Sequence, residues 1–211
     1  SASPGIFIQG LLVHGPGGKV LSQTYLPKEV VERAFSYAEE AQIACCGFLG
    51  DRNVTLAAHP RLDELHERYF EPASYVADSL EEILAQDVYK ILFYGDDEAV
   101  INGSVKPYWE ENLVEGAKIT RAIPEMLELV PAGTSKATGL AKLLREYSVT
   151  PEEMMAVGDG DNDLEMLQLA GLGVAVANAT SGLKEVADAM VSSNDDNGAA
   201  EALWKFVLKD E

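Results

Sequence analysis

The chain has 211 residues, of which 47% are hydrophobic and 24% are charged, a balance typical of a globular protein with a sizeable core. Its 35 acidic and 16 basic residues give a net charge of −19, which disfavours nucleic acid and anionic membranes as partners because both are bound through clustered basic charge. No apolar run approaches the roughly 18 residues of a membrane span, and residues 1–10 lack the basic and apolar regions of a signal peptide. We therefore expect a soluble intracellular protein, in the cytoplasm or an organelle stroma, that is not secreted.

The two cysteines of the chain, Cys45 and Cys46, are adjacent. A disulfide between neighbouring residues would be strained, and the chain has no C-x-x-C pair of the kind that binds metals. We expect both residues to be buried thiols.

The first part of the chain mixes strand and helix patterns. Apolar residues at helical spacing, among them Val30, Val31 and Ala34, predict a packed helix face, and Ser79 with Glu82 forms a capping box. In chain order the patterns predict a strand and hairpin at 5–26, a helix at 28–42, strands at 43–50 and 54–58, a helix near 61–70, a short helix at 79–86, a strand at 89–95, a helix in 105–113, and strands at 117–123 and 126–131.

From Thr134 onward, helices alternate with short strands that are apolar on both faces. The predicted order is a helix at 135–148, a helical turn at 150–153, a strand at 154–157, a helix at 163–170, a strand at 173–178, and helices at 181–187 and 198–209. Such alternation predicts a parallel sheet covered by helices. Ligands of such sheets bind beyond the carboxyl ends of the strands, which is where Asp159 falls.

The stretch AVGDGDNDLEML, residues 156–167, places several carboxylates in one turn. Like charges this close repel one another unless a cation relieves them, so the turn suggests a metal site. An EF-hand calcium loop does not fit, because its sixth and twelfth positions are occupied by Leu164 and Ala170. A strand end favours Mg²⁺ shared with a phosphate. The alternative is that Asp161 and Asp163 merely cap the following helix.

The turn Gly158-Asp159-x-x-Asn162-Asp163, with Lys136 upstream in GTSKATGLAKLL, resembles the third and fourth motifs of the haloacid dehalogenase (HAD) superfamily. The match is closest to its Cof-type sugar-phosphatase branch, and the stretches GVAVANAT and VSSNDDNGAAEAL look like that branch's usual sequel. This resemblance implies an α/β fold: a Rossmann-like core at 1–27 and 129–211, incomplete at its N-terminus, with an inserted α/β cap at 28–128.

The resemblance also implies a reaction, in which a Mg²⁺-dependent aspartate attacks a small phosphomonoester and the aspartyl-phosphate is hydrolysed. Asp159 would then be the direct Mg²⁺ ligand, and Asp163 a ligand of the metal or of its water. Asn162 would lie beside metal and phosphate, and Asn178 would also bind substrate. Lys136 would neutralise the phosphoryl oxygens, although the glycine that often follows this lysine is Ala137 here.

The family's first motif, D-x-D-G-[TV], supplies the nucleophile, and its second motif supplies a Ser or Thr. Neither is found, since Asp-Gly occurs only at Asp159-Gly160. We expect the chain to be inactive alone, as part of a longer phosphatase or assembly, or else to be a non-catalytic binding or assembly module. Loss of the opening strand would also expose a sheet edge beside 154–157, to be filled by residues 5–12, by a second copy in a homo-oligomer, or by an N-terminal fragment.

Overall fold

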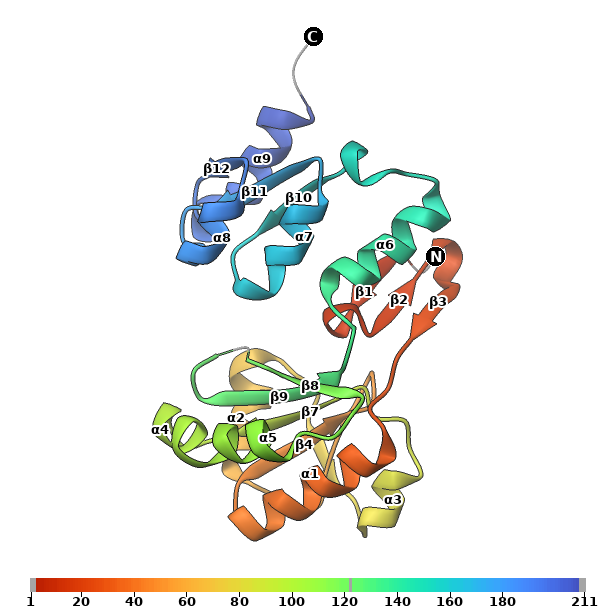
Figure 1. The fold of residues 1–211 in the computed structure, drawn as a ribbon, viewed down its shortest axis with the longest axis vertical. Helices are drawn as coiled ribbons and strands as arrows, with labels where there is room; N and C mark the ends of the chain where they lie inside the picture. The colour runs from red at the N-terminus through yellow and green to blue at the C-terminus, as the bar shows by residue number, and fades with distance from the viewer. Residues whose placement is uncertain (1–2, 122, 209–211) are drawn as a thin grey trace. The chain divides into compact units, whose positions relative to one another are not determined.

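The computed structural model describes residues 3–121 and 123–208, and the chain divides into two compact units (Figure 1). The first unit contains the residues up to 23 and those from 134 onward, and the second contains residues 24–133. Both units combine sheets with helices, which confirms the α/β fold class expected from the sequence.

The unit boundaries lie at 23/24 and 133/134, whereas the sequence placed them at 27/28 and 128/129. The backbone N–H of Leu26 donates to the carbonyl of Val88 at 2.8 Å, which ties the first linker to the second unit. Strand β9 (Met126–Pro131) pairs with two strands of the second unit and is not divided at 128. The assignment of the units as core and cap stays a prediction.

The first unit contains a three-stranded parallel sheet with the order β10-β11-β12. Its strands are β10 (Met155–Gly158), β11 (Leu172–Val176) and β12 (Ala189–Val191), and its helices are α6 (Lys136–Tyr147), α7 (Leu164–Leu169), α8 (Ser181–Val186) and α9 (Gly198–Phe206). The buried centre of β11 is apolar on both faces, as expected for a parallel sheet. Strand β12 was not expected from the sequence, and residue 209 of the expected last helix lies outside the described residues.

The opening hairpin forms a separate antiparallel sheet of β1 (Gly5–Phe7), β2 (Leu12–His14) and β3 (Val20–Gln23). It lies against α6 through a close backbone approach. A Cβ on Gly10 would lie 2.1 Å from the carbonyl oxygen of Ser135, and one on Gly139 would lie 3.0 Å from the Gly10 Cα. The suggestion that residues 5–12 fill the edge of the parallel sheet is therefore wrong, because their strand pairing and their contact with α6 hold them in the hairpin.

The second unit is built on a six-stranded mixed sheet with the order β6-β5-β4-β7-β9-β8. The strands not yet given are β4 (Ala44–Phe48), β5 (Asn53–Thr55), β6 (Ser74–Val76), β7 (Lys90–Tyr94) and β8 (Ala117–Thr120). Its helices are α1 (Lys28–Ala41), α2 (Pro60–Tyr69), α3 (Leu80–Leu84), α4 (Glu98–Val100) and α5 (Lys106–Asn112). Residue 122, within an expected strand, lies outside the described residues.

Both faces of this sheet are buried. One core cluster joins side chains of α1, α3 and α5, such as Phe35, Ile83 and Trp109, to the sheet, and a second joins Leu62 and Leu65 of α2 to its other face. The two free cysteines are buried in strand β4, which confirms the sequence expectation. Over the described residues, no helix has the length and apolar character needed to cross a membrane.

Candidate functional site

The acidic turn follows strand β10 directly. The strand ends at Gly158, a 3₁₀ turn spans Asp161–Asp163, and α7 begins at Leu164. Since β10 and β11 are parallel, with Gly158 paired to Ala175, their carboxyl ends lie at one edge of the sheet. The structure therefore places the turn where α/β sheets bind ligands.

Asp163 is the centre of this turn. It is 3% exposed, and its Oδ2 accepts hydrogen bonds from the backbone N–H groups of Asp159 at 3.1 Å and Gly160 at 3.3 Å. A Cβ on Gly158 would lie 2.6 Å from the Asp163 Cβ, so a glycine is needed for the carboxylate to fold back over the strand end. Asp163 thus shapes the loop that carries Asp159.

Lys136 is the ion-pair partner of Asp163, with 2.5 Å between Nζ and Oδ1. It is the first residue of α6, behind the N-cap Ser135, whose hydroxyl and backbone N–H form a capping box with Thr138. A cation is disfavoured at a helix N-terminus, so the buried carboxylate compensates for an unfavourable position. The side chain of Lys136 remains 32% exposed, so the ion pair is not sealed off from solvent.

A second hydrogen-bonded contact joins the turn to α8. The Thr180 hydroxyl donates to Asp161 Oδ1 at 2.6 Å, and the Thr180 backbone N–H donates to the carbonyl of Asp159 at 3.0 Å. Asp163 makes no side-chain capping bond to α7 itself, but its Oδ2 accepts from the Gly160 N–H and so caps the 3₁₀ turn that leads into this helix. Thr180 was not expected at the site, although its place before Ser181 at a helix start is typical of an N-cap.

The other predicted site residues lie in two different surroundings. Asp159 and Asn162 are exposed in the turn, near the Lys136 ion pair. Asn178 follows β11 at the same sheet edge, but its Oδ1 accepts a hydrogen bond from the backbone N–H of Asn194 at 3.0 Å. The structure thus places Lys136, Asp159 and Asp163 close together. The amide oxygen of Asn178 instead accepts a hydrogen bond from the loop at residue 194.

The turn supplies only some of the oxygen ligands that a Mg²⁺ ion needs. Among residues 3–121 and 123–208, no three His, Cys, Asp or Glu side chains are grouped so that they could hold a metal ion. Both carboxylate oxygens of Asp163 accept hydrogen bonds and Asp161 Oδ1 accepts one from Thr180, whereas the carboxylate of Asp159 and the amide oxygen of Asn162 are exposed in the turn. Because Mg²⁺ takes about six oxygen ligands and commonly keeps several waters, these two residues fit a shared site completed by water, phosphate or another segment.

Comparison with known proteins gives one consistent family. The sequence model of haloacid dehalogenase-like hydrolases matches residues 2–203. The chain is 42% identical over 208 residues to the chloroplastic endoribonuclease YBEY of Arabidopsis thaliana, covering 98% of this chain and 35% of that protein. It is 28% identical over 209 residues to the 5-amino-6-(5-phospho-D-ribitylamino)uracil phosphatase YitU of Bacillus subtilis, covering 97% of this chain and 76% of that protein.

A solved structure gives the same result. The crystal structure of a haloacid dehalogenase-like hydrolase from Bacteroides thetaiotaomicron is 31% identical and superposes with a TM-score of 0.77, covering 88% of this chain and 69% of that one. The chain thus spans about a third of the Arabidopsis protein and about two thirds of the Bacteroides chain. The family resemblance drawn from the acidic turn and Lys136 is confirmed.

Proposed function

Because the chain belongs to the haloacid dehalogenase-like hydrolases, we propose that it supplies one part of a Mg²⁺-dependent phosphatase site for small phosphorylated metabolites. The observation that carries this proposal is the ion pair of Lys136 with buried Asp163, formed beside the exposed carboxylate of Asp159. A fixed cation next to a free carboxylate at a sheet's carboxyl edge suits a phosphate bound together with a metal.

Each residue has a distinct role in this proposal. Lys136 neutralises the phosphoryl oxygens with its ammonium, and Asp163 fixes that ammonium and the turn. Asp159 and Asn162 hold Mg²⁺, which when bound supplies further positive charge to the phosphoryl group. Asn178 is proposed to position the loop at residue 194 beside the substrate.

The nucleophile is proposed to come from outside these 211 residues, because they contain no D-x-D-G-[TV] motif. The free edge of β10 supports a place for it: among the described strands, β10 pairs only with β11. An added strand there would satisfy the unpaired backbone groups and end next to Asp159. The strand would belong to the same longer polypeptide, to a separate N-terminal fragment, or to a second copy of the chain.

The proposed substrate is a small phosphomonoester of a sugar or polyol. The name of the Bacillus subtilis relative, which denotes a phosphorylated ribityl compound, supports this class. The Arabidopsis relative is named as chloroplastic, which supports the organelle stroma as a location. Its endoribonuclease name describes a protein of which the chain matches 35%, and the phosphate chemistry proposed here concerns the matched part alone.

Ligand-dependent thermal unfolding tests the proposal. A ligand at ten times its dissociation constant stabilises the native state by about 1.4 kcal/mol, a rise of several degrees in the unfolding midpoint. We expect Mg²⁺ to raise the midpoint, and inorganic phosphate with Mg²⁺ to raise it further. Asp159→Asn should abolish the Mg²⁺ effect and Lys136→Met the phosphate effect, while Glu165→Gln, an exposed carboxylate on α7, should change neither.

Two results of the same unfolding experiment would refute the proposed site. If neither Mg²⁺ nor phosphate changes the midpoint at millimolar concentrations, the chain is a non-catalytic module and the proposed site is wrong. Equal effects in Asp159→Asn and Glu165→Gln would show that Mg²⁺ binds elsewhere on this acidic chain.

A further inference from the structure

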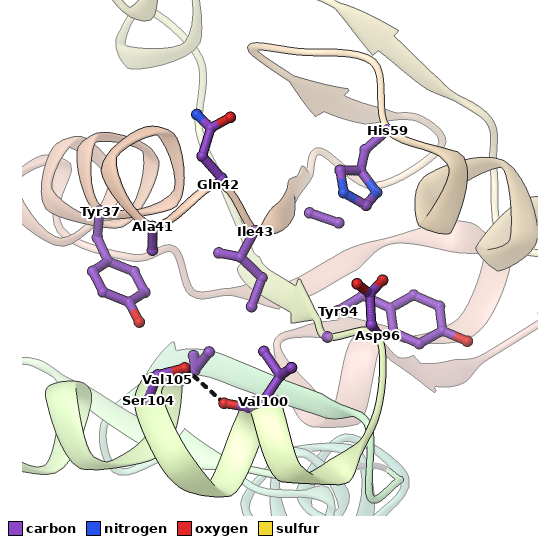
Figure 2. A pocket seen from close by; sticks show the side chains of 12 residues that line it. Tyr37, Ala41, Gln42, Ile43, His59, Tyr94, Asp96, Val100, Ser104 and Val105 are labelled. Atoms are coloured by element: carbon purple, nitrogen blue, oxygen red, sulfur yellow. Dashed lines mark hydrogen bonds between the residues drawn. The ribbon is translucent and has the colours of Figure 1, made fainter.

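The second unit contains a cavity that the proposed phosphate chemistry does not use. Its volume is about 330 Å³, and it lies between the C-terminal half of α1 and the segment that follows β5. A smaller cavity of about 60 Å³, drawn in Figure 2, shares four lining residues with it, namely Gln42, Ile43, Ala44 and His59, so the two cavities are adjacent. Sites for small molecules commonly have volumes of about 300–1,000 Å³, so the larger cavity suffices for a compact ligand.

The wall of the larger cavity combines an apolar side with polar groups. Phe35 and Ala38 of α1 line one side, Ile43 lies at the entrance to β4, and Leu56 follows β5. Phe35 and Ala38 are buried members of the unit's main core cluster, so this side of the cavity is part of the packed core. Such a wall accommodates the carbon skeleton of a ligand.

The larger cavity is lined by one acidic and no basic side chain among the described residues, whereas Arg61 lies beside Asp96 at the smaller one. Of the described residues that line them, none is Lys or Arg, and the acidic ones are Glu39 in the larger cavity and Asp96 in the smaller. Helix α1 also ends here, at Ala41, with Gln42 as its left-handed C-cap at φ 54°. A helix C-terminus carries partial negative charge, so the site favours a cation and disfavours a phosphate.

The smaller cavity adds two polar groups from separate loops. Figure 2 shows the His59 imidazole and the Asp96 carboxylate projecting toward the same space. His59 Nδ1 accepts a hydrogen bond from the backbone N–H of Arg61 at 3.2 Å, which assigns the ring proton of the neutral imidazole to Nε2. The Asp96 Oδ1 lies 3.5 Å from the Arg61 Nε, so Arg61 partly neutralises this carboxylate. Glu39 is therefore the main carboxylate that could pair with a bound cation.

We propose that the larger cavity binds a small organic amine. Its cationic nitrogen faces Glu39 and the C-terminal end of α1, and its apolar body lies against Phe35, Ile43 and Leu56. This binding site does not depend on the phosphatase proposal, because all its residues belong to the second unit.

Titration of the 211-residue chain with benzylamine, followed by amide NMR shifts, tests this site. Benzyl alcohol and benzoate serve as neutral and anionic probes of the same shape. We expect benzylamine to shift amides of residues 35–45 and 55–59, benzyl alcohol to bind more weakly, and benzoate to leave them unchanged. Glu39 and Glu40 are both exposed, and of the two only Glu39 lines the cavity. Glu39→Gln should therefore weaken benzylamine binding at least fivefold, and Glu40→Gln should not.

Three results would overturn the proposal. The first is no shift of these amides at 20 mM benzylamine, and the second is a benzoate effect as large as that of benzylamine. The third is an equal loss of affinity in Glu39→Gln and Glu40→Gln, which would indicate attraction of the cation to the acidic surface in general.

Discussion

Replacement of Asp163 by alanine removes the acceptor that holds the candidate site together. Three donors lose their partner: the Lys136 ammonium at 2.5 Å and the backbone N–H groups of Asp159 at 3.1 Å and Gly160 at 3.3 Å. An unsatisfied buried donor costs about 1–3 kcal/mol, and removing one member of a buried ion pair costs about 3–5 kcal/mol. Because Lys136 is 32% exposed and water replaces part of the loss, we expect the first unit to lose about 3 kcal/mol of unfolding free energy.

Asp163→Asn provides the internal comparison. Its amide oxygen still accepts from the two backbone donors but carries no charge, so we expect a loss of about 1–2 kcal/mol. Glu165→Gln removes an exposed carboxylate from α7 and should cost less than about 0.5 kcal/mol.

Hydrogen–deuterium exchange measured on peptides is the appropriate assay, because two units can unfold separately and a global transition would mix them. Peptides from β10 and β11 should lose protection in Asp163→Ala, while those from the second unit keep it. A loss below about 1 kcal/mol in β10, or an equal loss in Asp163→Asn and Asp163→Ala, would refute the reasoning that charge and acceptor both stabilise the turn.

Two further predictions concern the rest of the molecule. Gly10→Ala should lower the unfolding free energy of the first unit by about 2 kcal/mol or more, because φ is 98° and the new Cβ would lie 2.1 Å from the Ser135 carbonyl oxygen. Gly17 has φ 67° and open space around it, so Gly17→Ala should lower the free energy measured by urea unfolding by less than half as much. Burial raises the pKa of the Cys46 thiol to about 12, so the unfolded chain, with a thiol pKa of about 8.5, loses this proton first as the pH rises. The unfolding free energy of the second unit should therefore fall between about pH 8.5 and 12, and less steeply in Cys46→Ala; identical slopes would contradict this.

Much of the fold could be predicted from the sequence, because hydrophobic periodicity and capping residues act locally. Half of the capping box expected from Ser79 and Glu82 forms: the Ser79 hydroxyl accepts from the Glu82 backbone N–H at 3.3 Å, but the Glu82 carboxylate accepts from the N–H of Asp78 and not from that of Ser79. Strands β6 and β12 were missed because neither lies in a longer apolar or alternating run of the kind that marked the other short strands. The separation of the opening hairpin into its own sheet was also missed, since it depends on the contact of Gly10 with α6, far away in the sequence.

The sequence singled out the acidic turn and Lys136, but it could not give their contacts. The acidic turn stood out through its clustered carboxylates and Lys136 through the family resemblance, but the sequence could not show that Asp163 is buried and paired with Lys136. The hydrogen bond from Thr180 to Asp161 was likewise invisible, because it joins residues that only the parallel sheet brings together. Cavity residues such as Glu39 have no motif, and only the packing of α1 on its sheet defines them.

The central claim is that these 211 residues hold the cation and the metal ligands of a phosphatase site and lack its nucleophile. Incubation of the purified chain with Mg²⁺ and p-nitrophenyl phosphate, followed by the release of nitrophenolate, tests it most directly. We predict no release above that of buffer with Mg²⁺ alone, because no covalent phosphoryl intermediate can form without the nucleophile. Magnesium-dependent turnover that disappears in Asp159→Asn would contradict the claim and would place the nucleophile within this chain.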